Sequence, residues 1–276
     1  MAENQATTEL EEAPAGVSAM IPNTARIMDY LLGGSANFAS DRAVGDTAFV
    51  NWPGETGGVE GVKVDLHAAR DALRRIVQYL AGECGIRQFL DLASGLPTMD
   101  NTHLAARSVA PGCRVVYVDN NPSVASHGQY LLASDPDTVF LQADFRDPKD
   151  IVARASETLD FTQPVGLILF GVLHFVDDAD GPQQLLDDLL AAVPSGSYLA
   201  LSHFAKDDVD SALNAMLTEM DKQTGDSVFR RTRSEVERFF DGMDVVPPGV
   251  VETELWRPQV QGPKPLPMWA GLARKR

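Results

Sequence analysis

The sequence predicts an α/β fold in which a doubly wound, mostly parallel sheet carries helices on both faces. Two observations support this prediction. Five short apolar runs between residues 89 and 201 alternate with helical patterns, as in consecutive strand–helix–strand units. Acidic residues, Asp91, Asp119 and Asp144, also lie at or near the ends of three successive strands, at intervals of about one such unit. Because the carboxyl ends of neighbouring parallel strands open into one crevice, this pattern places a ligand site there.

The first predicted strand, Phe89–Leu92, ends at a turn of small residues, Ala93-Ser94-Gly95, after which Thr98 or Asp100 can cap a helix. In a doubly wound sheet this order of strand, turn and helix opens a nucleotide site. Gly95 lacks a Cβ atom, so its backbone can turn sharply and admit a ligand closely. An ordinary strand, turn and helix without any ligand is the alternative interpretation of this stretch taken alone.

The other elements follow in chain order. Further strands are expected at residues 114–118, 139–142, 165–170 and 197–201, then at 245–246, 250–256 and 267–274, the final two as an antiparallel hairpin at one sheet edge. Helices are expected at residues 62–80, 102–109, 122–133, from 148 onward, and at 182–193, 207–223 and 232–241. The last helix opens with a capping box, Thr232-Arg-Ser-Glu235. The fifth strand is followed directly by Ser202 and His203.

The N-terminal part divides into two segments before the sheet begins. Residues 1–19 are rich in Glu, Ala and Thr and have almost no large apolar side chains, which predicts a disordered acidic tail. Residues 20–60, the N-terminal cover, open with a short helix that Asn23 or Thr24 can cap and that Gly33-Gly34 ends. We expect this segment to fold over a cofactor site, and a helical edge with solvated charges is the alternative.

Composition excludes several classes of partner. The 276 residues carry a formal net charge of −16, and because nucleic-acid binding depends on basic patches, no nucleic acid is expected as a partner. The same charge disfavours anionic membranes, and no apolar run suits a signal peptide or a membrane span. Cys84 and Cys113 have no metal-ligand spacing, so no metal is expected. These features predict a cytoplasmic protein with one main domain at residues 61–276.

The turn and the strand-end carboxylates together narrow the choice of ligand. A dinucleotide fingerprint needs three glycines where only Gly95 is present, which disfavours a nicotinamide oxidoreductase. Carboxylates suit a positively charged ligand, and S-adenosylmethionine (SAM) carries a sulfonium and an ammonium group. Asp119 can accept hydrogen bonds from ribose hydroxyls, and Asp91 can face the ammonium group, directly or through water. Asp144 can accept from an adenine amino group, with Phe145 beside the ring. One such Asp is more often a turn former, but three at corresponding strand ends favour a site.

These motifs resemble those of class I SAM-dependent methyltransferases, and more closely those of an actinobacterial S-adenosyl methyltransferase family. The resemblance covers nearly the whole chain after residue 20 and rests on Ala25–Gly34, Asn37-Phe38, Asp41-Arg42, Gly95–Thr98, Val116–Asn120, Ala143–Pro148 and Ser202-His203. It implies a Rossmann-like sheet of seven strands, and it adds to the cofactor-binding residues Arg26, Gly33, Gly34, Ala93 and Asn120. The turn keeps only the last of the family's usual glycines, which leaves open how the methionine part of SAM is held.

The resemblance implies methyl transfer to an acceptor by SN2 displacement, which needs a base only if the acceptor starts protonated. The candidates for that base are His174 and His203, which follow the fourth and fifth strands, and Tyr30 of the N-terminal cover is a further catalytic candidate. The alternative for His174 is packing against the cofactor, and the alternative for His203 is a structural hydrogen bond to the N-terminal cover. We expect a small-molecule acceptor and a monomer or homodimer. A SAM-binding protein with little catalytic activity is the competing hypothesis.

Overall fold

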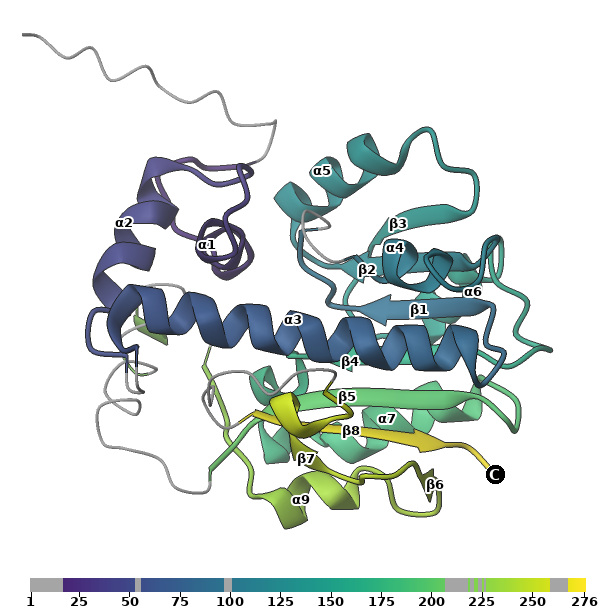
Figure 1. The fold of residues 1–276 in the computed structure, drawn as a ribbon. Helices are drawn as coiled ribbons and strands as arrows, with labels where there is room; N and C mark the ends of the chain where they lie inside the picture. The colour runs from purple at the N-terminus through teal and green to yellow at the C-terminus, as the bar shows by residue number, and fades with distance from the viewer. Residues whose placement is uncertain are drawn as a thin grey trace, which may run out of the picture.

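Strands with the predicted order form the centre of the molecule (Figure 1). The structure is a computed structural model, and it describes residues 17–52, 56–96, 101–206, 218, 221–222, 225, 227–258 and 268–276. The five parallel strands are β1 (Gln88–Leu92), β2 (Arg114–Asp119), β3 (Thr138–Gln142), β4 (Gly166–Phe170) and β5 (Tyr198–Phe204). They lie in the order β3-β2-β1-β4-β5. The chain adds β2 and β3 on one side of β1 and then crosses to add β4 and β5 on its other side, so the strand order switches between β1 and β4, as in other doubly wound folds.

Three further strands complete the sheet at its β5 edge. β8 (Met268–Arg274) runs antiparallel to β5, and the two-residue strands β6 (Asp244–Val245) and β7 (Val251–Glu252) both pair with β8. The described residues therefore form eight strands, and the prediction of seven is wrong because both short segments on the far side of β8 pair with it. The predicted hairpin of the last two strands is confirmed by the pairing of β7 with β8, although most of residues 253–256 form a 3-10 turn.

Helices cover both faces of the sheet, as the fold class requires. One face carries α3 (Gly58–Gly82), α4 (Thr102–Arg107) and α5 (Pro122–Leu132), and the other carries α6 (Pro148–Ala155), α7 (Pro182–Ala191) and α9 (Arg233–Arg238). The apolar side chains of α3, such as Ile76 and Leu80, pack with Phe89 of β1. On the opposite face, Ile151 and Leu186 pack with Leu90. Each face of the parallel strands is thus buried, which explains their nearly continuous apolar sequences.

Local capping signals predicted most helix starts correctly. The side chain of Asn121 accepts a hydrogen bond from Ser123 N at 2.9 Å at the start of α5, and the capping box of Thr232 and Glu235 opens α9. The proposed caps of α4, Thr98 and Asp100, lie outside the described residues, as does most of the predicted helix at 207–223. β5 is longer than predicted and includes Ser202 and His203, because it pairs with β8 along its whole length.

The N-terminal cover forms two helices with a small apolar core of their own. α1 (Thr24–Leu31) and α2 (Ala39–Ala48) bury Ile27, Leu31 and Val44 against Phe49, Trp52 and Val62. The side chain of Asn23 caps α1, as predicted, by accepting a hydrogen bond from Ala25 N at 3.0 Å. Residues 1–16 of the predicted tail lie outside the described residues, whereas the carbonyl of Ala19 already accepts a hydrogen bond from Ser40 Oγ.

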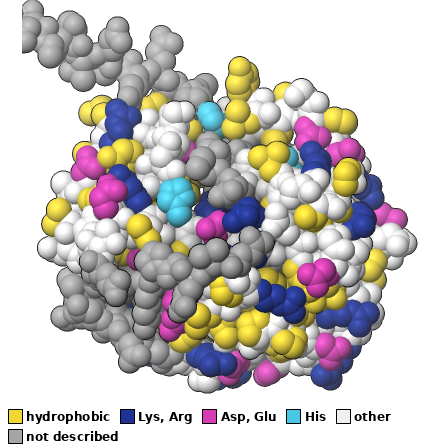
Figure 2. Space-filling model, viewed as in Figure 1, with side chains coloured by type: hydrophobic (Ala, Val, Ile, Leu, Met, Phe, Trp, Pro, Cys, Tyr) yellow, Lys and Arg dark blue, Asp and Glu magenta, His cyan; other side chains and the backbone are white. Residues whose placement is uncertain are grey.

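The surface in Figure 2 mixes charges of both signs. Acidic and basic side chains are interspersed on this face, and no continuous basic area is seen over its described residues. Across the described ranges, no helix has both the length and the apolar composition that a membrane crossing needs.

Candidate functional site

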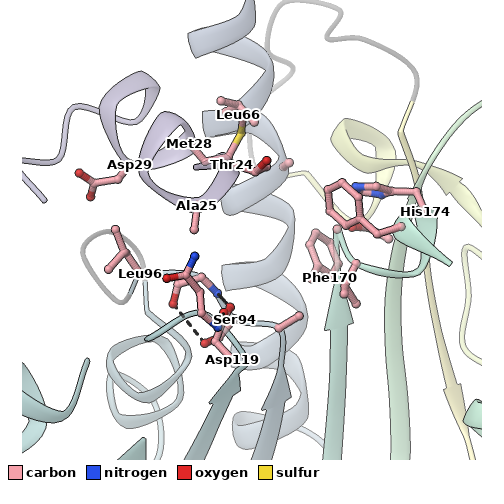
Figure 3. A pocket seen from close by; sticks show the side chains of 18 of the residues that line it. Thr24, Ala25, Met28, Asp29, Leu66, Ser94, Leu96, Asp119, Phe170 and His174 are labelled. Atoms are coloured by element: carbon pink, nitrogen blue, oxygen red, sulfur yellow. Dashed lines mark hydrogen bonds between the residues drawn. The ribbon is translucent and has the colours of Figure 1, made fainter. Parts of the chain in front are cut away.

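A cavity of about 330 Å³ lies where the carboxyl ends of the parallel strands meet the N-terminal cover and α3 (Figure 3). This is the size of a small-ligand site, and it occupies the crevice where doubly wound sheets bind ligands. The strands and the segments after them contribute Ala93–Leu96, Asp119–Asn121, Ala143, Phe145, Arg146, Phe170–Val172, His174, Phe175, Ser202, Phe204, Val228 and Met268. The cover and α3 contribute Asn23–Ala25, Met28, Asp29, Leu32, Phe49, Trp52, Val62, Leu66, Ala69 and Arg70.

The glycine turn after β1 forms part of this wall. Ala93 and Gly95 have φ angles of 49° and 66°, and Ser94 N donates a hydrogen bond to Val118 O at 3.1 Å, which fixes the turn against β2. A side chain is strained at such φ angles, which explains the glycine at position 95. A Cβ atom built on Gly95 would meet no atom within 4 Å, so the backbone there borders open space.

Asp119 connects the end of β2 to this turn. Its Oδ2 accepts a hydrogen bond from Gly95 N at 3.0 Å, and its Oδ1 accepts one from Asn121 N at 2.9 Å (Figure 3). Two backbone donors use about half of the acceptor capacity of a carboxylate, so each oxygen keeps one lone pair for a ligand. Burial raises the pKa of Asp119, while the two backbone hydrogen bonds oppose this shift. Asn120, a predicted cofactor-binding residue, also lines the cavity.

Asp91 is buried beneath the turn and does not line the cavity. Its Oδ2 accepts a hydrogen bond from Thr102 Oγ1 at 2.6 Å, which holds the start of α4 against β1. Burial raises the pKa of Asp91 to about 6, and the Thr102 hydrogen bond and the charge of Arg70 act in the opposite direction. This position does not support a direct contact of Asp91 with an ammonium group, whereas the contact through water stays a prediction.

At the end of β3 the structure separates two residues that were predicted to act together. Phe145 lines the cavity, whereas Asp144 does not. The Oδ1 atom of Asp144 accepts a hydrogen bond from Arg146 N at 3.0 Å, and its carboxylate lies beside the Arg146 guanidinium. That guanidinium lies over the Phe145 ring, 5.3 Å from its centroid, and Arg146 also lines the cavity. The adenine contact predicted for Asp144 is better matched by Phe145 and Arg146.

Two predicted residues of the N-terminal cover point away from the cavity. The Arg26 guanidinium is buried, with Nε 2.7 Å from Asp41 Oδ2 and Nη2 2.6 Å from Ile21 O. Tyr30 donates its hydroxyl hydrogen to Asp46 Oδ1 at 2.7 Å near the surface. Neither side chain lines the cavity, so neither the cofactor contact predicted for Arg26 nor the catalytic contact predicted for Tyr30 is supported.

The glycines after α1 act through Asp29, which does line the cavity. Gly33 has a φ of 82° and ends the helix, and a Cβ atom on Gly34 would lie 2.0 Å from Asp29 Oδ1. The other carboxylate oxygen, Oδ2, accepts hydrogen bonds from Ala36 N at 2.8 Å and Asn37 Nδ2 at 2.9 Å. Gly33 and Gly34 do not line the cavity themselves, and the missing side chain of Gly34 leaves space for the Asp29 carboxylate.

The two candidate bases differ in their surroundings. His174 lines the cavity, while His203 does not. The Nδ1 atom of His174 is buried without a hydrogen-bond partner, and burial, then the nearby His203 and Arg231, hold its pKa well below the ordinary value. His203 uses both ring nitrogens, Nε2 toward Arg231 Nη1 at 2.7 Å and Nδ1 toward Phe204 O at 2.9 Å. Of the two, only His174 is placed to act on a bound molecule.

Arg70 is a cavity residue that sequence reasoning missed. It belongs to α3, lines the cavity, and its charge acts on Asp91 beneath the glycine turn. No hydrogen bond or ion pair joins its guanidinium to another described side chain, which leaves its donors available to a ligand. A signal was present in the sequence, because Arg70 lies four residues after Leu66 and three before Leu73, on the apolar face of the helix.

Comparison with known proteins agrees with these features. A profile of the S-adenosyl methyltransferase family matches residues 10–276. A crystal structure from Thermobifida fusca, provisionally described as a methyltransferase, is 38% identical with a TM-score of 0.86, covering 95% of this chain and 98% of that one. A DUF574 family protein from Streptomyces avermitilis is 37% identical with a TM-score of 0.85, covering 93% and 98%. Mitomycin 7-O-methyltransferase shares the fold alone, at 17% identity and a TM-score of 0.51, covering 79% and 57%. No curated protein matches at a significant level.

Proposed function

The chain belongs to the S-adenosyl methyltransferase family and is a SAM-dependent methyltransferase, and from that premise we propose that its acceptor is a small molecule bound between the N-terminal cover and the ends of β4 and β5. The observation that carries the proposal is the continuity of the cavity, which runs from Asp119 and Gly95 to His174 and Ser202 under α1. The cavity thus extends past the cofactor groups, toward the ends of β4 and β5. Mitomycin 7-O-methyltransferase, which shares the fold, is named for a small-molecule acceptor.

The residues at the ends of β1, β2 and β3 fit SAM as the cofactor. SAM supplies an electrophilic methyl group on its sulfonium. Asp119 keeps free lone pairs that can accept from ribose hydroxyls, and the backbone at Gly95 leaves open space for close approach. Phe145 offers an aromatic face for the adenine ring. Arg70 provides the cation that the methionine carboxylate needs, which would compensate for the missing glycines of the turn.

The protein's own contribution is to align the two molecules and to exclude water. The side of the cavity near β4 and β5 is aromatic, with Phe170, Phe175 and Phe204, and α1 places Met28 above it. Such a surface favours an apolar acceptor over a highly charged one. A SAM-binding module with little activity is not supported, because the cavity extends beyond the strand-end groups suited to SAM, as far as His174 and Ser202.

Calorimetric titration with SAM tests the cofactor residues, and the matched variants are Asp119→Ala and Asp144→Ala. Asp119 lines the cavity while Asp144 does not, although both follow strands. We expect Asp119→Ala to lose roughly 5- to 150-fold in SAM affinity, which corresponds to about 1–3 kcal/mol. Asp144→Ala should keep nearly full affinity. Equal affinities for the two variants would overturn the assignment of Asp119.

The acceptor class is tested by release of S-adenosylhomocysteine from SAM when small-molecule fractions and macromolecular fractions of a cell extract are supplied separately. Turnover dependent on the small-molecule fraction supports the proposal. Turnover dependent only on protein or nucleic acid would contradict it.

A further inference from the structure

Two buried polar atoms in the cavity wall have no hydrogen-bond partner. They are Nδ1 of His174 and Oγ of Ser202, whose residues are 3% and 0% exposed. The described part of the chain holds other unpaired buried side-chain atoms, on Trp256 and Trp269 for example, but these two residues do not line the cavity, whereas His174 and Ser202 do. A buried polar group left without a partner is destabilising, so these two groups need an explanation.

The strand itself does not require a hydroxyl at position 202. Ala200 precedes Ser202 on the same face of β5, and Ala270 is its register partner in β8, so alanine would be compatible with the packing there. Ser197, close to the other end of the same strand, provides a contrast. It is equally buried, but its Oγ accepts a hydrogen bond from Val165 N at 3.0 Å. The hydroxyl of Ser197 has a structural partner, whereas that of Ser202 has none, although Ser202 lines the cavity.

Aromatic side chains surround these two polar groups. The His174 ring lies 4.4 Å from the Phe175 ring and 4.6 Å from the Phe204 ring, measured between centroids. Phe170 is the register partner of Ser202 in β4, and all three phenylalanines line the cavity. A flat apolar molecule matches such walls, because aromatic rings pack favourably against one another.

The charge near His174 distinguishes between possible polar groups on that molecule. The nearest titratable neighbours are His203 on β5 and the buried guanidinium of Arg231, which is paired with the exposed Asp178. The charge of Arg231 opposes an ammonium group there and so favours a neutral polar group such as a hydroxyl. Burial and these neighbours also hold the pKa of His174 low, so its imidazole is neutral and can accept a hydrogen bond.

We propose that this end of the cavity is an acceptor subsite for a flat aromatic molecule whose hydroxyl group bonds to His174 and Ser202. The proposal rests on the methyl-transfer function given above. In the reaction the acceptor oxygen forms a bond to the methyl carbon while the bond from that carbon to sulfur breaks, with its electron pair passing to sulfur. The hydroxyl proton passes to His174 and then to solvent. A weak base suffices, because an oxygen that is gaining a bond to carbon becomes strongly acidic.

Binding to the full chain saturated with S-adenosylhomocysteine tests the proposal without turnover. The probes are 7-hydroxycoumarin and 4-nitrophenol, and the hydroxyl-free counterparts are coumarin and nitrobenzene. We expect each hydroxylated probe to bind about tenfold more tightly than its counterpart, as one net hydrogen bond provides. Binding of S-adenosylhomocysteine without any preference for the hydroxyl would overturn the acceptor subsite alone. Failure of S-adenosylhomocysteine itself to bind would instead count against the proposed function.

The variants Ser202→Ala and His174→Phe identify the groups responsible, with Ser197→Ala as the matched control. Ser202→Ala should lose most of the hydroxyl preference while its thermal midpoint stays equal or rises, because an unpaired buried group is removed. Ser197→Ala should show the reverse, a lower midpoint with the preference unchanged. His174→Phe keeps an aromatic ring and should also lose the preference. Retention of the preference in both Ser202→Ala and His174→Phe would overturn the proposal.

Discussion

Arg231 Nη1 lies 2.7 Å from His203 Nε2, a geometry that requires the unprotonated nitrogen to accept from the guanidinium. The other ring nitrogen, Nδ1, then donates to Phe204 O at 2.9 Å. Arg231 also donates to the carbonyls of Leu173 and Val176, on either side of His174. His203 therefore serves as a neutral anchor for the arginine that shapes the segment after β4, and it has no free nitrogen for an acceptor.

This anchor predicts that acid destabilises the protein. Burial lowers the pKa of His203 to about 4, below its ordinary value of about 6.5 in an unfolded chain. Between these values the unfolded state binds more protons, so the contribution of His203 to the free energy of unfolding rises with pH up to about 6.5 and is level above it. The contribution is about 3 kcal/mol across this window. Urea unfolding of wild type and His203→Gln at several pH values measures it, and identical pH slopes would refute it.

Asp91 should contribute a pH dependence of the opposite sign. Burial raises its pKa from 3.8 to about 6, so the folded state binds more protons between these values. The stability that Asp91 provides is present below about pH 4 and is lost as the pH rises through 6, by about 3 kcal/mol. Asp91→Asn can still accept from Thr102, and we expect its stability relative to wild type to increase between pH 4 and 7. A constant difference over that range, by urea unfolding without SAM, would contradict the assignment.

Arg70 is predicted to bind the carboxylate of the cofactor. Arg70→Gln should weaken S-adenosylhomocysteine binding by about 10- to 150-fold, the range for a hydrogen bond to a charged group. Binding of 5′-methylthioadenosine, which lacks the amino-acid carboxylate, should not change. Arg74→Gln is the control, because Arg74 lies one turn further along α3 and pairs with Asp71 outside the cavity. Equal losses for both ligands would mean that Arg70 acts through the fold instead.

The two glycines after α1 should differ in their effect on binding. Gly33→Ala places a side chain at a φ of 82° with free space around it, so it costs about 1–2 kcal/mol of stability. Gly34→Ala forces a Cβ atom against the Asp29 carboxylate, which must then leave its place in the cavity wall. We expect calorimetry to show weakened SAM binding only for Gly34→Ala. Normal binding by that variant would show that the position of Asp29 does not matter.

The sequence was sufficient for features set by local chemistry, such as β1 to β4 and the caps at Asn121 and Thr232. It was insufficient where orientation depends on distant packing. Within α1, Arg26, Asp29 and Tyr30 lie on one helix, yet only Asp29 reaches the cavity, because successive residues are rotated by about 100° and the docking of the helix selects the face. The end of β5 was misplaced for the same reason, since its partner β8 lies about seventy residues later.

The separate core of the N-terminal cover has a consequence for how such proteins can diversify. Its buried side chains, from Ile27 to Trp52, pack mainly on one another and on the first turn of α3, while the groups suited to SAM belong mostly to the strands. Changes in the cover can therefore reshape the part of the cavity wall that the cover contributes, while the strand-end residues keep their positions. Exchange of residues 17–52 between relatives offers a modular route to new acceptors with the same methyl donor.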